Sequence, residues 1–169
     1  MGEWCHRDRG EPVAALGLKP AELSVLAVLR HYCAGFAVPE RHGWIAAIST
    51  ALTAFGEDRG PEVAVAALGV IQSVRRLRRS SFVFNSADCA TCAAYVTGHE
   101  RLVLSALRAV ARGQDTAAHA YATLLCEGAD AAPVVRALGV LIDRAFEADD
   151  AVVAPCPAGA RDRAGPTRH

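Results

Sequence analysis

The clearest chemical potential in this sequence lies in two cysteines, Cys89 and Cys92, at the predicted start of a long apolar helix. Two cysteines three positions apart on a helix project from the same side, one turn from each other. Such a pair can form a disulfide, ligate a metal ion together, or pack as two small apolar side chains. The sequence by itself leaves all three roles open.

A redox role depends on how readily the two thiols ionise. The start of a helix and nearby cations both lower the pKa of a thiol, whereas the adjacent carboxylate of Asp88 opposes ionisation. A cluster of four arginines precedes the pair at the end of the preceding predicted helix: Arg75, Arg76, Arg78 and Arg79. The balance between these charges depends on how the intervening residues 80–85 fold.

In Cys89, Cys92 and their helical context, the chain resembles the AhpD and carboxymuconolactone decarboxylase-like family of helical proteins. That family carries a histidine four residues after the second cysteine, where this sequence has Val96, and His99 follows three residues later. The resemblance covers less than a tenth of the chain. It implies a thiol–disulfide oxidoreductase as an alternative function, without the histidine that would transfer a proton to the thiols.

A metal site would need more ligands than the pair supplies, since zinc takes four sulfur or nitrogen ligands. We predict that Cys33 and Cys126, on other helices, complete a set with Cys89 and Cys92 for zinc or an iron–sulfur cluster. His99 lies about 10.5 Å along the helix axis from Cys92, too far for the same ion. Further candidate ligands on other helices are His31, His42 and His119.

The composition indicates a single domain with a core of small aliphatic side chains. The chain has 169 residues, of which 52% are hydrophobic but only 6% aromatic. Its 18 basic and 18 acidic residues cancel, so nucleic acid is not an expected partner. No apolar run is long enough to span a bilayer. Only six cysteines, spread thinly over 169 residues, and the lack of a secretory signal predict a cytoplasmic protein with reduced thiols.

Hydrophobic periodicity predicts an all-α fold, a compact bundle of five or six antiparallel helices. We expect a flexible leader at residues 1–17, a helical domain at 18–147 and a disordered tail at 148–169. Residues 80–85 break the helical periodicity, and residues 81–85 are the only strand-like run. The first predicted helix begins near Lys19 or Pro20 and ends between Gly35 and Pro39. The other predicted helices cover residues 39–55, 61–79, 88–112, 115–128 and 131–146. Glycine or proline lies near most of the helix ends.

These observations favour a small cytoplasmic binding or accessory protein. In it, Cys89 and Cys92 ligate a metal or respond to redox state, and the apolar helices contact a protein partner or a second copy of the chain. A second alternative is an interaction scaffold whose thiols are buried and inert. The sequence has no phosphate-binding loop, nucleophile elbow or paired metal-binding motif, so no catalytic residue is predicted.

Overall fold

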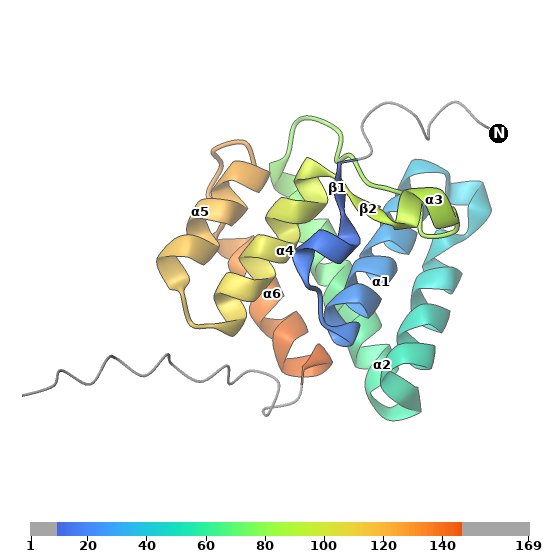
Figure 1. Cartoon of the computed structure of the whole chain (residues 1–169). Helices are drawn as coiled ribbons and strands as arrows, with labels where there is room; N and C mark the ends of the chain where they lie inside the picture. Colours follow the sequence, from blue (N-terminus) through green and yellow to red (C-terminus); the bar gives the residue numbers. More distant parts are fainter. Residues whose placement is uncertain (1–9, 147–169) are drawn as a thin grey trace, which may run out of the picture.

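The all-α prediction is confirmed by a computed structural model, which describes residues 10–146 (Figure 1). The α-helices of this part are α1 (Pro20–Ala37), α2 (Gly43–Leu77), α3 (Ala90–Ala93), α4 (Gly98–Ala111), α5 (Asp115–Leu125) and α6 (Ala132–Ala145). The short elements are β1 (Glu11–Pro12), η1 (Val13–Leu16), η2 (Pro39–Arg41) and β2 (Tyr95–Val96). None of the described helices is both long and apolar enough to cross a membrane.

The strands β1 and β2 pair antiparallel, with Glu11 opposite Val96. Together with η1, they give residues 10–17 a defined structure, so the predicted end of the leader at residue 17 is wrong. This segment joins the domain through backbone pairing of β1 with β2, and the sequence pattern did not reveal that pairing. The predicted flexible residues 1–9 and the predicted tail at 148–169 lie outside the described residues.

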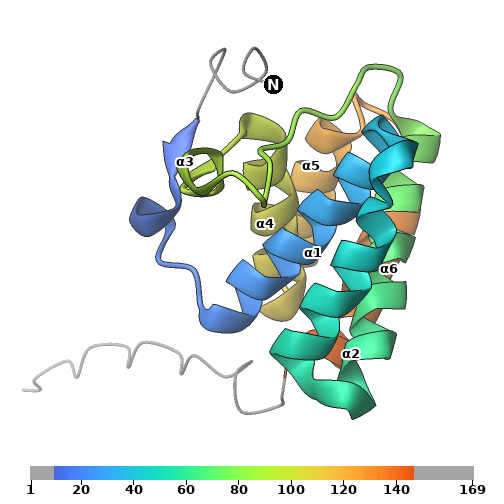
Figure 2. The same cartoon turned by 90° about the vertical axis from the view of Figure 1, so that its right-hand side faces the viewer.

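Helix α2 is a hairpin of two helices joined at Gly56, whose φ of 80° and ψ of 172° are not helical. Figure 2 shows the chain reversing direction within α2. Two helices are predicted for this region, but the break is confined to Gly56, and residues 57–60 are helical rather than a turn. The two halves approach so closely that a Cβ on Gly60 would lie only 2.7 Å from the Cα of Leu52, and the glycine at this position permits the approach.

The core consists mainly of Ala, Val and Leu, as the composition predicts. Helix α1 packs on α2, α2 packs on α6, and α4 packs on α5 and α6. Figure 2 shows α1 between α2 and α4. Among the largest fully buried side chains are Val28, Val70, Leu107, Leu125 and Leu138. The predicted helices corresponding to α1, α5 and α6 are confirmed within a few residues.

The single long helix predicted for residues 88–112 is wrong, because α3, β2 and α4 occupy this stretch. Thr97 caps α4: its Oγ1 accepts a hydrogen bond from the Glu100 N–H at 3.2 Å, and Glu100 Oε2 accepts one from the Thr97 N–H at 2.8 Å. This reciprocal capping box defines a helix start. The cysteine pair therefore lies on a separate four-residue helix rather than on α4.

The crossing of α1 and α2 predicts that Gly43→Ala destabilises the protein by about 1–3 kcal/mol. A Cβ on Gly43 would lie 2.5 Å from the carbonyl oxygen of His31 and 2.6 Å from the nitrogen of Gly35. Urea unfolding followed by circular dichroism measures the loss. The matched control is Gly69→Ala, where nothing lies within 4 Å and alanine should stabilise the helix by up to about 1 kcal/mol. Equal effects of both substitutions would contradict the close crossing.

Candidate functional site

The structure brings Cys89 and Cys92 to within 3.3 Å of each other without a disulfide bond. Cys89 precedes α3 as its N-cap, and its Sγ accepts the backbone N–H of Cys92 at 3.5 Å. Cys89 is half-buried, whereas Cys92 is only 6% exposed. The pair therefore combines one half-buried cysteine with one buried cysteine.

The structure does not bring the other two predicted ligands to this pair. Cys33 on α1 and Cys126 after α5 both belong to the hydrophobic core. Burial raises the pKa of the Cys126 thiol and raises that of Cys33 to about 12. Among residues 10–146, no three His, Cys, Asp or Glu side chains are close enough to hold a metal ion. The predicted set of four cysteines is thus not assembled here, because core packing holds two of them elsewhere.

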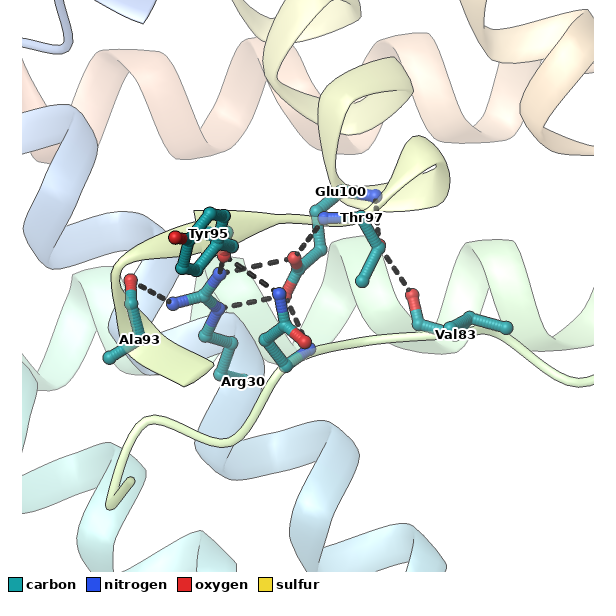
Figure 3. A network of polar contacts seen from close by, with 7 residues as sticks. Arg30, Val83, Ala93, Tyr95, Thr97 and Glu100 are labelled. Atoms are coloured by element: carbon teal, nitrogen blue, oxygen red, sulfur yellow. Dashed lines mark hydrogen bonds and ion pairs between the residues drawn. The ribbon is translucent and has the colours of Figure 1, made fainter. Parts of the chain in front are cut away.

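A buried ion pair between Arg30 and Glu100 lies next to the cysteine helix (Figure 3). Arg30 Nε donates to Glu100 Oε1 at 2.7 Å, and Nη2 donates to Oε2 at 3.1 Å. The two side chains are 4% and 2% exposed. Arg30 also donates to the carbonyl oxygens of Ala93 at 3.1 Å and Tyr95 at 2.5 Å. This one guanidinium therefore holds the end of α3 and β2 against α1.

This ion pair was not predicted from the sequence, although the position of Glu100 at a helix start could have been predicted. Thr97 and Glu100 have the spacing of a capping box, which predicts a helix start at Thr97. Arg30 gave no such signal, since it stands among the apolar residues of α1, 70 positions from its partner.

The segment between α2 and α3 is fixed by side chains of the same network instead of by a strand partner (Figure 3). Glu100 Oε1 accepts the Asn85 N–H at 3.1 Å, and Asn85 Nδ2 donates to the Tyr95 carbonyl at 2.8 Å. Thr97 Oγ1 donates to the Val83 carbonyl at 2.8 Å. The strand-like run predicted at residues 81–85 is thus neither helix nor strand, because its polar groups pair with α4, with the α4 N-cap Thr97 and with β2.

His99 contacts this segment rather than the cysteine pair. Its Nδ1 accepts the Val83 N–H at 2.9 Å, and its ring lies 5.5 Å from that of Phe82. Burial lowers the pKa of His99, and the charge of Arg78 lowers it further, while Glu127 opposes both. The imidazole brought toward the start of α3 is instead that of His31, whose Nδ1 lies 3.9 Å from Asp88 Oδ1.

A groove of about 300 Å³ lies between α1, the end of α2 and the segment that follows it. Arg75 covers one edge, with its guanidinium carbon 3.8 Å from the centre of the Phe36 ring. The groove is lined by Cys33, Phe36, Ala37, Ile71, Val74, Arg75, Arg78, Ser80, Ser81, Phe82 and Phe84. The sequence did not predict it, because its walls come from three separate segments.

Comparison with models of known families, with curated proteins and with solved structures gives no match. The resemblance to the AhpD family is therefore carried by Cys89, Cys92 and their helical surroundings alone. Function has to be inferred from the geometry of the cysteine pair, the buried ion pair and the groove.

We predict that Arg30→Met destabilises the protein by about 3–5 kcal/mol, because the carboxylate of Glu100 would remain buried without its cation. Chemical denaturation measures this loss. Arg101→Met is the matched control, since Arg101 forms an exposed ion pair with Glu11 at 3.7 Å. That substitution should cost at most about 1 kcal/mol. A similarly small effect at Arg30 would show that the buried pair contributes no more than a surface pair.

The lowered pKa of His99 predicts that the protein loses stability on acidification. Because its pKa is lowered in the folded state, the unfolded chain binds the proton more readily. The stability contribution is complete above the ordinary histidine pKa of about 6.5 and is lost as the pH falls through the lower folded value. Melting temperatures measured between about pH 7.5 and about pH 5 should fall less in His99→Gln than in the parent protein. His119→Gln, at an exposed position of α5, should leave the pH dependence unchanged; equal slopes for both variants would exclude His99 as the source.

Proposed function

We propose that this chain is a small binding or accessory protein in which Cys89 and Cys92 respond to redox state by forming and breaking a disulfide. The observation that carries the proposal is their 3.3 Å approach. A disulfide needs its sulfur atoms at about 2.05 Å, so a small adjustment of one helical turn is sufficient. With oxidised glutathione as oxidant, the two thiols lose two electrons and two protons, and the glutathione disulfide is reduced to two thiols.

Redox response is favoured over metal ligation because too few metal-ligating side chains lie at the cysteine pair within residues 10–146. Two sulfurs are half of a zinc ligand set, and residues 10–146 supply no third ligand. A redox pair needs only an accessible thiol and a second thiol that attacks the mixed disulfide. Cys89 is the more exposed of the two and suits the first role, and the buried Cys92 suits the second. In a reducing compartment such as the cytoplasm, the proposed resting state is the dithiol.

The contacts of α3 suggest how oxidation would reach the surface. The Ala93 carbonyl accepts from Arg30 Nη1 at 3.1 Å, and the Ala94 carbonyl accepts the Val13 N–H at 2.9 Å. A disulfide that tightens α3 would change both acceptors and so loosen the segment containing β1 and η1. We propose that a protein partner or a second copy of the chain distinguishes these two states.

An exposed apolar group on the first half of α2 also supports the partner interaction. It consists of Trp44, Ile45 and Ile48, all of which are exposed. Neighbouring exposed apolar side chains are typical of interaction surfaces.

We predict that equilibration with oxidised and reduced glutathione produces one disulfide, between Cys89 and Cys92. Differential alkylation and peptide mass mapping measure its fraction at each ratio. In the oxidised state, hydrogen exchange should become faster at the Val13 amide and remain unchanged at the amide of Ala67 in the core.

The control variants are Cys33→Ala and Cys126→Ala, which should form the same disulfide at the same glutathione ratio. Cys89→Ser should abolish it. Two outcomes contradict the proposal: thiols at 89 and 92 that react only after unfolding, or a disulfide that instead joins one of them to Cys5 or Cys156. Stoichiometric metal in protein purified without oxygen, lost in Cys89→Ser/Cys92→Ser, would replace redox response with ligation.

A further inference from the structure

We propose that the groove between α1, the end of α2 and residues 80–84 binds a small monoanionic carboxylate with an apolar tail. This site is separate from the cysteine pair and does not depend on its redox role. Its volume of about 300 Å³ lies at the lower end of the range of small-molecule pockets. Such pockets are mostly apolar, with a few polar groups that orient the ligand.

The walls of the groove suit an alkyl or aryl tail. Phe36 comes from α1, Ile71 and Val74 come from α2, and Phe82 and Phe84 come from the following segment. The intervening Val83 is 52% exposed, so alternate side chains of this extended segment face the groove and solvent. The apolar side of the segment is therefore directed into the groove.

Arg75 supplies the charge that selects an anion. Among residues 10–146, its guanidinium stacks on Phe36 and contacts the amide oxygen of Gln72 at 3.4 Å. No carboxylate between residues 10 and 146 forms an ion pair with Arg75, whereas Arg78 is paired with Glu127 at 3.1 Å. Within the described residues, the groove thus carries at its edge one positive charge that no carboxylate pairs with. A planar guanidinium, held by its face on a ring, presents its N–H edge to a carboxylate.

The groove is held open before any ligand arrives. Val83 is fixed through its N–H by His99 at 2.9 Å and through its carbonyl by Thr97 at 2.8 Å. At the other end of the segment, the Ser80 N–H contacts the carboxylate of Glu127 at 3.3 Å. A wall fixed at both ends reduces the ordering cost of binding. The thiol of Cys33, whose pKa is about 12, contributes a neutral lining.

The test is a titration of the full chain with decanoate below its micelle concentration, followed by amide chemical shifts in two-dimensional NMR spectra. We expect saturable shifts at Phe36, Phe82 and Phe84. Decanol has the tail without the charge, and acetate has the charge without the tail; each should bind at least about tenfold more weakly than decanoate. Inorganic phosphate and decyltrimethylammonium should produce no saturable shifts at these residues.

Arg75→Gln should weaken decanoate binding by about tenfold, the equivalent of one charge-assisted contact, and leave decanol binding unchanged. Arg76→Gln is the matched control, because Arg76 is exposed and adjacent but does not line the groove. The proposal is overturned if decanoate gives no saturable shifts at the groove, if decanol, acetate or phosphate binds as tightly, or if the two variants weaken decanoate binding equally. Circular dichroism of both variants confirms that each is folded.

Discussion

The buried ion pair of Arg30 and Glu100 is the interaction on which the arrangement of this protein depends. Taking two charges out of water costs several kcal/mol for each ion, so such a pair persists only when its remaining hydrogen-bonding groups are satisfied. Here, the backbone of Ala93, Tyr95 and Asn85 supplies those partners. No buried side-chain nitrogen or oxygen of the described residues lacks one. The need to satisfy this pair holds the end of α3, β2 and the segment containing Asn85 against α1 and α4.

Glu100 also determines where the cysteine pair lies. By capping α4 together with Thr97, it begins that helix at Gly98, nine residues after Cys89. The cysteines consequently occupy a single separate turn, which lacks the long row of aligned peptides that produces a helix dipole. The upstream arginines do not compensate, since Arg78 contacts Leu125 and Glu127 and Arg75 stacks on Phe36. What the structure shows of the pair is therefore the proximity of its two cysteines.

The cysteine pair and the groove are connected through one segment, residues 78–89. Its first half forms a wall of the groove, and its second half leads to Cys89. Between them, Asn85 is held by Glu100 and by the Tyr95 carbonyl. A single polar network thus positions both the cysteine pair and one wall of the groove.

The sequence alone determined what depends on near neighbours in the chain: the helical class, the aliphatic core, and helices α1, α5 and α6. Apolar periodicity and glycine or proline at helix ends are local signals, and they were sufficient there. Only the tertiary structure decided which distant residues meet. It joined Arg30 to Glu100, buried Cys33 and Cys126 away from the cysteine pair, and directed His99 to Val83. Such pairings follow from how whole helices pack, and packing is a property of side-chain shapes in three dimensions that spacing along the chain does not encode.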